Sequence, residues 1–246
     1  MTPAQLTDRL CRSVERLSFT APVETVYNPL VYARAGFDRY LARFGARPKR
    51  VLFFGMNPGP WGMAQTGVPF GEIRAVREWM GIEARIDAPA TQHPKRPVLG
   101  FDCRRSEVSG KRLWGWAASR CPSADDFFGQ MLVLNYCPLI FFDRAGRNIT
   151  PDRLPLSERR PLLAVCDQAL AEWVDFYAPG HVVGIGRFAA GRCRAVLDDA
   201  VVSTGVITHP SPANPRANAG WAERIENELD ALGIDLPGQP NERGLK

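Results

Sequence analysis

Long apolar runs are missing from this chain of 246 residues. None approaches the roughly 18 residues that span a bilayer, and the amphipathic N-terminal segment lacks the continuous apolar core of a secretory signal. We therefore expect an intracellular protein that does not enter membranes.

Metal-ligand patterns are scarce as well. The six cysteines are scattered and none forms a CxxC pair, which argues against a zinc ribbon and against an iron–sulfur cluster. Three histidines are too few to favour a His-rich site. We expect no metal, and reduced thiols that lie partly in the core.

An extreme composition is absent too. Hydrophobic residues make up 45% of the chain and charged residues 23%, which is typical of a globular protein and excludes disorder as the main state. No Gly/Ser/Pro linker divides the sequence, so we expect a single domain over residues 1–246, with its core at about 20–235. The 31 basic and 26 acidic residues give a net charge of +5, a mild excess that is compatible with a polyanionic partner.

Four short apolar segments, rich in β-branched and aromatic residues, predict buried strands. They cover residues 50–55, 131–136, 181–186 and 201–209. Helical patterns lie between and after them, at 72–80, 157–177, 187–197 and about 219–232. This alternation predicts an α/β fold in which helices cover both faces of a mainly parallel sheet.

The loops after these strands have unusual chemistry. Ligands of such folds bind in the crevice outside the carboxyl ends of the strands. Here the four strands run into GMNPGP, NYCPL, GIGRFA and HPSPANP. Four such loops at one edge of a sheet predict a functional site there.

Four side chains in or near these loops are candidates for chemistry. Asn57 is held in a rigid Gly/Pro loop, and Asn135 ends an apolar strand, where an unbonded amide is costly. His209 precedes a stretch with three prolines, and Phe70 stands before a helix with its ring available for stacking. Each also has a structural interpretation: backbone hydrogen bonds for the two amides, core packing for the phenyl ring and an ordinary structural role for the imidazole.

Residues 184–189 read GIGRFA and match the GxGxxA pattern of dinucleotide-binding folds. The match comes late in the chain, and the next strand does not end in the Asp or Glu that binds a ribose. Two other interpretations stand beside it. In the first, the glycines and the helix N-terminus bind a single phosphate. In the second, the segment is only a tight turn, in which glycine allows close packing.

A basic stretch with interleaved tryptophans runs from residue 93 to 120, and it suits a DNA phosphate backbone. The alternative is a solvated loop that its tryptophans anchor to the core. Residues 87–112 lack regular periodicity, and residues 236–246 predict a frayed tail. The basic residues that we predict to bind DNA are Lys95, Arg96, Lys111 and Arg112.

Two long motifs and four shorter ones carry a family resemblance. The long ones are GMNPGPWGMAQTGVPFGE (55–72) and HPSPANPRANAGW (209–221). The shorter ones are HPKRPVLG (93–100), SEVSGKRLWGW (106–116), NYCPL (135–139) and RNITP (147–151). Together they resemble the single-strand-selective monofunctional uracil-DNA glycosylase family over roughly residues 20–235.

This resemblance implies a fold and a reaction. The fold is the three-layer α/β/α sandwich of the uracil-DNA glycosylase superfamily, with a central four-stranded sheet. The reaction is hydrolysis of the N-glycosidic bond between deoxyribose and uracil, or a uracil altered at its 5-position such as 5-hydroxymethyluracil. Free base and an abasic site are the products, and neither a lyase step nor any metal or cofactor is implied.

The resemblance also assigns roles to residues. Asn57 positions the attacking water, and His209 stabilises the negative charge that develops on the departing base. Phe70 stacks on the extruded ring and Asn135 reads its edge. The further substrate-binding positions are Met56, Gly59 and Met63, the last two near the 5-position of the ring.

For the DNA strand itself, the loops after the third and fourth strands are implied. Their residues are Gly186, Arg187, Ser211, Pro212, Ala213, Asn214 and Arg216. The family often has an arginine where this chain has Ala213, in the wedge that enters the base stack. We therefore expect Arg216, or the bulk of residues 210–214, to fill the gap that a flipped base leaves.

The expected partner is single- or double-stranded DNA that contains uracil or a related damaged base, bound by a monomer. The expected compartment is the cytoplasm, at the nucleoid, in a bacterium and the nucleus in a eukaryote. Two alternatives share the fold: a glycosylase for another deaminated base, xanthine or hypoxanthine, and a non-catalytic binder of damaged DNA.

Overall fold

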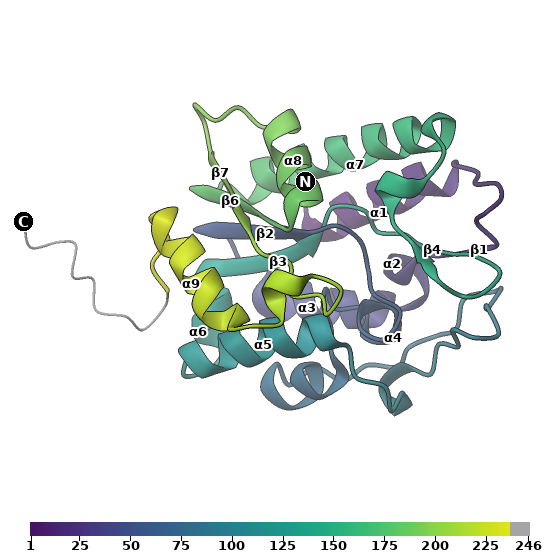
Figure 1. Cartoon of the computed structure of the whole chain (residues 1–246), viewed down its shortest axis with the longest axis horizontal. Coiled ribbons are helices and arrows are strands. Elements are labelled where there is room, and N and C mark those ends of the chain that lie inside the picture. Colours follow the sequence, from purple (N-terminus) through teal and green to yellow (C-terminus); the bar gives the residue numbers. More distant parts are fainter. Residues whose placement is uncertain (237–246) are drawn as a thin grey trace, which may run out of the picture.

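Four parallel strands form the centre of the computed structural model, which describes residues 1–236. Their order is β3-β2-β6-β7 (Figure 1). The strands are β2 (Val51–Gly55), β3 (Met131–Asn135), β6 (His181–Ile185) and β7 (Ser203–Ile207). They are the four predicted strands, and their parallel pairing confirms the predicted fold class. Of the expected frayed tail, residues 237–246 lie outside the described residues.

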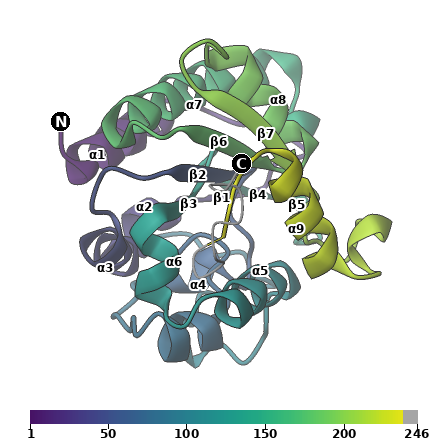
Figure 2. The same cartoon turned by 90° about the vertical axis from the view of Figure 1, so that its left-hand side faces the viewer.

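Helices cover both faces of this sheet (Figure 2). Helices α1, α7 and α8 lie on one face, α3, α5 and α6 lie on the other, and α9 packs beside β7. The longer helices are α1 (Pro3–Glu15), α3 (Arg34–Phe44), α5 (Val108–Arg120), α6 (Ala124–Gln130), α7 (Leu156–Tyr177), α8 (Arg187–Val196) and α9 (Trp221–Ala231). Short helical segments are α2 (Pro29–Tyr32), α4 (Met63–Thr66) and the 3₁₀ turns Gly100–Asp102, Pro151–Arg153 and Pro215–Ala217. None of the helices in residues 1–236 combines the length and the apolar character that crossing a membrane requires.

A second, antiparallel sheet was not predicted from the sequence. It consists of β1 (Thr25–Tyr27), β4 (Ile140–Phe142) and β5 (Asn148–Ile149), in the order β1-β4-β5. Strands of two or three residues are too short to show an alternating pattern. The sheet matters for the site because β5 brings its own end to the carboxyl edge of the main sheet.

The segment 72–80 is helical, but it is not the predicted α-helix. Ala75–Trp79 form one π-helical turn, in which the Met80 N–H donates to the Ala75 carbonyl at 3.0 Å. Ile73, Val76 and Met80 are nevertheless buried on one side, as their spacing predicted.

The prediction of irregular structure over residues 87–112 is wrong at its end, where α5 begins at Val108. Gly110 and Gly115 lower the intrinsic helix propensity of this segment. Lys111 and Arg112 fall within its first two turns and obscure the apolar face in the sequence. Helix α5 therefore follows from its packing in the fold more than from its local sequence.

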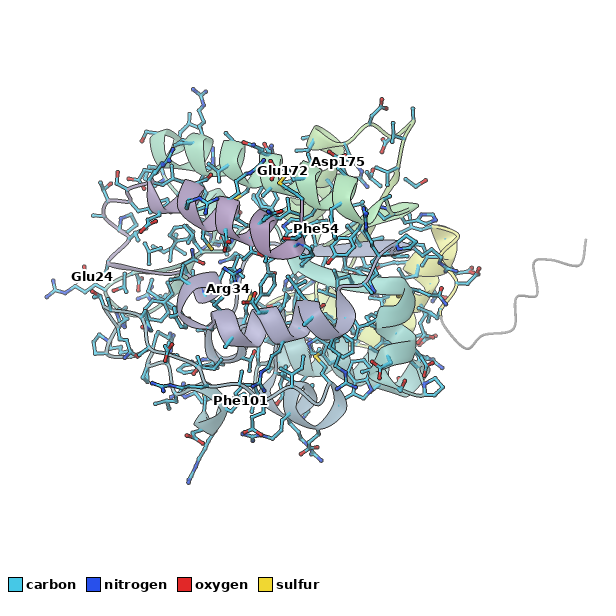
Figure 3. All side chains as sticks on the ribbon, turned by 180° about the vertical axis from the view of Figure 1, so that it is seen from behind. Glu24, Arg34, Phe54, Phe101, Glu172 and Asp175 are labelled. Atoms are coloured by element: carbon cyan, nitrogen blue, oxygen red, sulfur yellow. The ribbon has the colours of Figure 1, made fainter. Side chains whose placement is uncertain are left out.

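Helix α3 protects the outer edge of the sheet at β3. The Tyr40 hydroxyl donates to the Val133 carbonyl at 3.0 Å and accepts from the Val133 N–H at 3.2 Å. An edge strand otherwise exposes such groups to unwanted pairing. Arg34 lies on the same side of the molecule (Figure 3). Its guanidinium joins α3 to α1 through a bond of 2.6 Å to Asp8, and it also donates to Asp38 of its own helix at 2.6 Å.

Strand β6 and helix α8 lie so close together at Gly184 that one added methyl group should lower the free energy of unfolding. A Cβ on Gly184 would lie 2.1 Å from the Ala190 backbone nitrogen, so Gly184→Ala should lower the free energy of unfolding by about 2–3 kcal/mol through overpacking. Gly191→Ala, on α8 with open space around it, is the matched control and should stabilise by up to about 1 kcal/mol. Urea unfolding measures both, and equal effects of the two substitutions would contradict the packing.

Candidate active site

Three of the four parallel strands end at one cavity of about 350 Å³. The loop after β2, the end of β3 and the segment after β7 form its wall, together with the start of α5 and the β5 region. The lining residues are Met56, Asn57, Pro58, Gly59, Pro60, Phe70, Glu107, Ser109, Asn135, Asn148, Thr150, His209 and Ser211. The structure thus brings together the four predicted candidates, with Met56 and Gly59 beside them.

Asn57 has its amide fixed by the loop that follows β3. Its Nδ2 donates to the Leu139 carbonyl at 3.1 Å. A carbonyl oxygen only accepts, so this bond settles which end of the amide faces Leu139. The Oδ1 atom of Asn57 is left as an acceptor at the cavity wall.

Asn135 presents an unsatisfied oxygen. Its Oδ1 is buried and has no hydrogen-bond partner within residues 1–236, while its Nδ2 has only the Met63 sulfur, at 3.1 Å. An unsatisfied buried acceptor costs about 1–3 kcal/mol, so a ligand N–H placed there would be favourable. Met63, predicted to bind substrate, does not line the cavity but lies buried behind this amide.

Phe70 is held in a strained conformation by α5. Its φ is +51°, a left-handed value that costs a residue other than glycine about 1 kcal/mol or more. The Trp114 indole N–H donates to the Phe70 carbonyl at 2.9 Å and stabilises this turn. The phenyl ring comes close to Asn135, because a Cβ on Gly55 would lie 2.6 Å from the Asn135 Oδ1 and 2.7 Å from the ring.

His209 is a neutral donor. Its Nδ1 accepts the Ser211 N–H at 3.1 Å, so its proton is on Nε2. Burial lowers the pKa of His209 to about 4. The ring lies 6.0 Å from that of Phe70, centroid to centroid.

Glu107 is a lining residue that sequence reasoning missed. Its Oε2 is buried without a hydrogen-bond partner in the described chain. Burial, and to a lesser extent the carboxylate of Glu72, raise its pKa to about 7. Ser109, Asn148 and Thr150 were missed as well. Glu107 and Ser109 belong to the motif SEVSGKRLWGW, and Asn148 and Thr150 belong to the motif RNITP, so the polar residues of these motifs were the available signal. Asn148 and Thr150 reach the site at the end of the unpredicted sheet.

The residues predicted to bind DNA fall into separate places. Gly186, Arg187, Asn214 and Arg216 line a depression of about 270 Å³ beside His209, and Lys95 and Arg96 line a groove of about 770 Å³ with Trp61. Pro212 and Ala213 are exposed on the loop after β7, Ser211 faces the cavity, and Lys111 is exposed on α5.

Arg112 has structural partners of its own. Its guanidinium donates to the Pro210 carbonyl at 2.9 Å and to the Asn218 Oδ1 at 3.1 Å. It therefore ties α5 to the loop that carries His209. As for metals, no three His, Cys, Asp or Glu side chains of residues 1–236 gather in a way that could hold an ion.

Comparison with known proteins gives consistent matches. The family model of the uracil DNA glycosylase superfamily matches residues 42–229. A single-strand selective monofunctional uracil-DNA glycosylase of Rattus norvegicus is 46% identical over 228 residues, 92% of this chain and 82% of that protein. The protein of that name from Bos taurus is also 46% identical, over 92% of this chain and 84% of its own length. The crystal structure of wild-type Pedobacter heparinus SMUG2 covers 93% of this chain and 97% of its own, with a TM-score of 0.64 at 15% identity, which shows a shared fold.

The neutral state of His209 is directly measurable. In an NMR titration of the ring protons, the resonance that disappears in His209→Gln should shift with a midpoint near pH 4, because burial disfavours the charged ring. Ring ¹⁵N shifts at pH 7 should report a proton on Nε2. A midpoint near the ordinary value of about 6.5 would contradict the buried environment.

Proposed function

The chain belongs to the uracil-DNA glycosylase superfamily and, within it, to the single-strand selective monofunctional uracil-DNA glycosylases, and from that membership we propose that it excises uracil from DNA. The N-glycosidic bond is hydrolysed, uracil leaves as the free base and an abasic site remains. The observation that carries the proposal is that one cavity is lined by the Phe70 ring, by the Nε2–H of His209 and by the Asn135 Oδ1, which has no hydrogen-bond partner among residues 1–236.

Asn135 selects uracil by the pattern of its edge. The base offers a donor at N3 and an acceptor at O4, so Oδ1 accepts from N3–H while Nδ2 exchanges its weak contact with the Met63 sulfur for O4. Cytosine has the opposite pattern and would leave both amide atoms facing like groups, a mismatch that rejects analogues strongly. Phe70 stacks on the extruded ring.

His209 stabilises the leaving group. Negative charge develops on the uracil ring as the bond to C1′ breaks, and the Nε2–H donates to it. Because the imidazole is already neutral and its Nδ1 is bonded to Ser211, it donates a hydrogen bond without reorganising, as oxyanion-hole groups do.

Asn57 orients the nucleophile. With Nδ2 bound to the Leu139 carbonyl, the free Oδ1 accepts a hydrogen from water and directs a lone pair of that water toward C1′. An amide is not a base, so its contribution is positioning.

The proposed substrates include uracils substituted at the 5-position, since the resemblance places the Gly59 backbone, which lines the cavity, near that position of the ring. The DNA strand would follow the basic surfaces described above, with Arg187 and Arg216 beside His209 and Lys95 and Arg96 on the groove next to Trp61. We propose a monomer that acts wherever the DNA of the cell lies, on single and double strands.

Removing either polar group should slow chemistry more than binding. Asn57→Ala and His209→Ala should each lower the single-turnover rate of base release by about 10²–10³ with little change in DNA affinity, whereas Asn227→Ala on the exposed side of α9 should be neutral. The assay uses a single-stranded oligonucleotide with one uracil, with and without alkali. Strand breaks without alkali, or no release of uracil by the wild-type chain, would contradict the proposal. Release only from matched oligonucleotides that carry xanthine or hypoxanthine in place of uracil would support a glycosylase for another deaminated base.

Arg216 is proposed to fill the gap left by the flipped base. Since only a duplex has a complementary stack to support, Arg216→Ala should slow excision from duplex DNA by about tenfold, or about 1.4 kcal/mol, and leave single strands nearly unaffected. Arg85→Ala, at a highly exposed arginine outside both basic surfaces, is the control. Equal loss on the two substrates, or no loss, would remove this role.

A further inference from the structure

Glu107 occupies a space that two glycines keep clear. A Cβ on Gly59 would lie 1.7 Å from its Oε1, and a Cβ on Gly62 would lie 1.7 Å from its Oε2. The carboxyl group therefore rests directly on the backbone of the loop that begins with Asn57. Any other residue at these two positions would displace it, so the loop is shaped to accept a carboxyl group at the cavity wall.

This carboxyl group has no cation beside it to neutralise its charge within residues 1–236, where no Lys, Arg or His forms an ion pair with Glu107. Arg105, two residues earlier, stacks on Trp61 at 4.4 Å instead. A buried carboxyl group with an unpartnered oxygen and no counter-ion in the described chain is costly, and packing alone does not require one.

The charged and titratable groups around Glu107 are few. Glu72 is the carboxylate that acts on it, and Glu72 is itself held by the Ser106 hydroxyl and the Ala75 N–H, both at 2.9 Å. His209 lines the same cavity and is neutral. The loop that contains Gly59 and Gly62 contributes no titratable side chain.

Hydrolysis of a glycosidic bond moves a proton from the attacking water to the departing base, and a general base at the cavity wall can carry it on the way. Water loses one proton as its oxygen bonds to C1′, and Asn57 is too weakly basic to take it. Of the described residues that line the cavity, only Glu107 and His209 titrate. The Nδ1 of His209 is occupied by the Ser211 N–H and its Nε2 already carries a proton, so the imidazole is excluded as the acceptor.

We propose that Glu107 is the general base that takes the proton of the attacking water, an assignment that rests on the proposed function and deepens it. The water oxygen forms its bond to C1′ while one of its protons passes to the Glu107 carboxylate. The C1′–N1 bond breaks, and its electron pair goes to the uracil ring, where His209 donates to it. The proton then leaves Glu107 for solvent or for the departing uracil anion, which restores the carboxylate.

The protonation state of Glu107 gives this role a clear signature. A carboxyl group with a pKa near 7 is neutral below that pH and ionised above it. A base acts only in its ionised form, so the rate should rise with pH up to about 7 and then level. A pKa close to the working pH is also the most effective one for proton transfer.

The test measures single-turnover release of uracil from a single-stranded oligonucleotide as a function of pH. The range runs from about pH 5.5 to about pH 9, which includes the pKa expected of a general base that works near neutral pH. The wild-type rate should rise about tenfold per pH unit below 7, and Glu107→Gln should remove that rise and lower the plateau by about 10²-fold. Because the glutamine amide keeps the shape of the carboxyl group that it replaces, the Asn57 loop should stay in place, which thermal unfolding of the variant verifies. Formate added to Glu107→Ala should restore part of the rate.

Glu72→Gln is the matched control. It removes a neighbouring carboxylate that does not line the cavity, so it should keep the plateau and move the midpoint to lower pH. If the pH profile of Glu107→Gln keeps the wild-type inflection, at any plateau rate, Glu107 is not the base. Its role would then be to support the Asn57 loop structurally. A wild-type chain that releases no uracil would overturn the proposed function, and this assignment with it.

Discussion

Burial of the side chains at the cavity wall sets the properties of each polar group there. Burial lowers the pKa of His209 and raises that of Glu107, so one imidazole stays neutral and one carboxyl group titrates near neutrality. The same burial leaves the Asn135 Oδ1 without a partner in the described chain. In a medium of low dielectric, a donor that meets developing charge is also more effective than it would be in water. The chemistry proposed for this chain therefore depends on the walls of the cavity as much as on the groups that line it.

Those walls depend on close approach between segments that are distant in the sequence. Helix α5 supports Phe70 through the Trp114 indole and ties down the His209 loop through Arg112. Its first residue is preceded by Glu107, which rests on the loop after β2. One helix thus connects Phe70, the loop that carries His209 and the loop that begins with Asn57. A change in the position of α5 would disturb all three together.

The parts of this arrangement that the sequence predicted are those with local signals. The four apolar strands were visible in composition, and Asn57, Asn135 and His209 stood out because each is a polar residue at the carboxyl end of a strand. The small antiparallel sheet has strands too short for a pattern, and α5 is obscured by two glycines and two cations. Glu107 was visible within a motif, but its burial against Gly59 and Gly62 is a tertiary fact that no local pattern encodes. For the same reason Arg112 suggested a phosphate contact, although its guanidinium is bonded to the protein.

The opposite pKa shifts in the cavity also govern how the stability of the fold varies with pH. His209 in the unfolded chain would bind a proton below its ordinary value of 6.5, and the folded chain resists this until about 4, so stability falls as pH drops through that interval. Glu107 would lose its proton above 4.5 when unfolded but keeps it to about 7 when folded, so stability falls as pH rises through that range. Between about pH 4.5 and 6.5 the cost at His209 falls with rising pH while the cost at Glu107 increases. The sum of the two is therefore nearly constant in this range, and it is smaller there than at lower or higher pH. If Glu107 is the base, the chain is most active at a pH where its fold bears the full cost of a buried, ionised carboxylate, and a more stable variant at that position would be a slower enzyme.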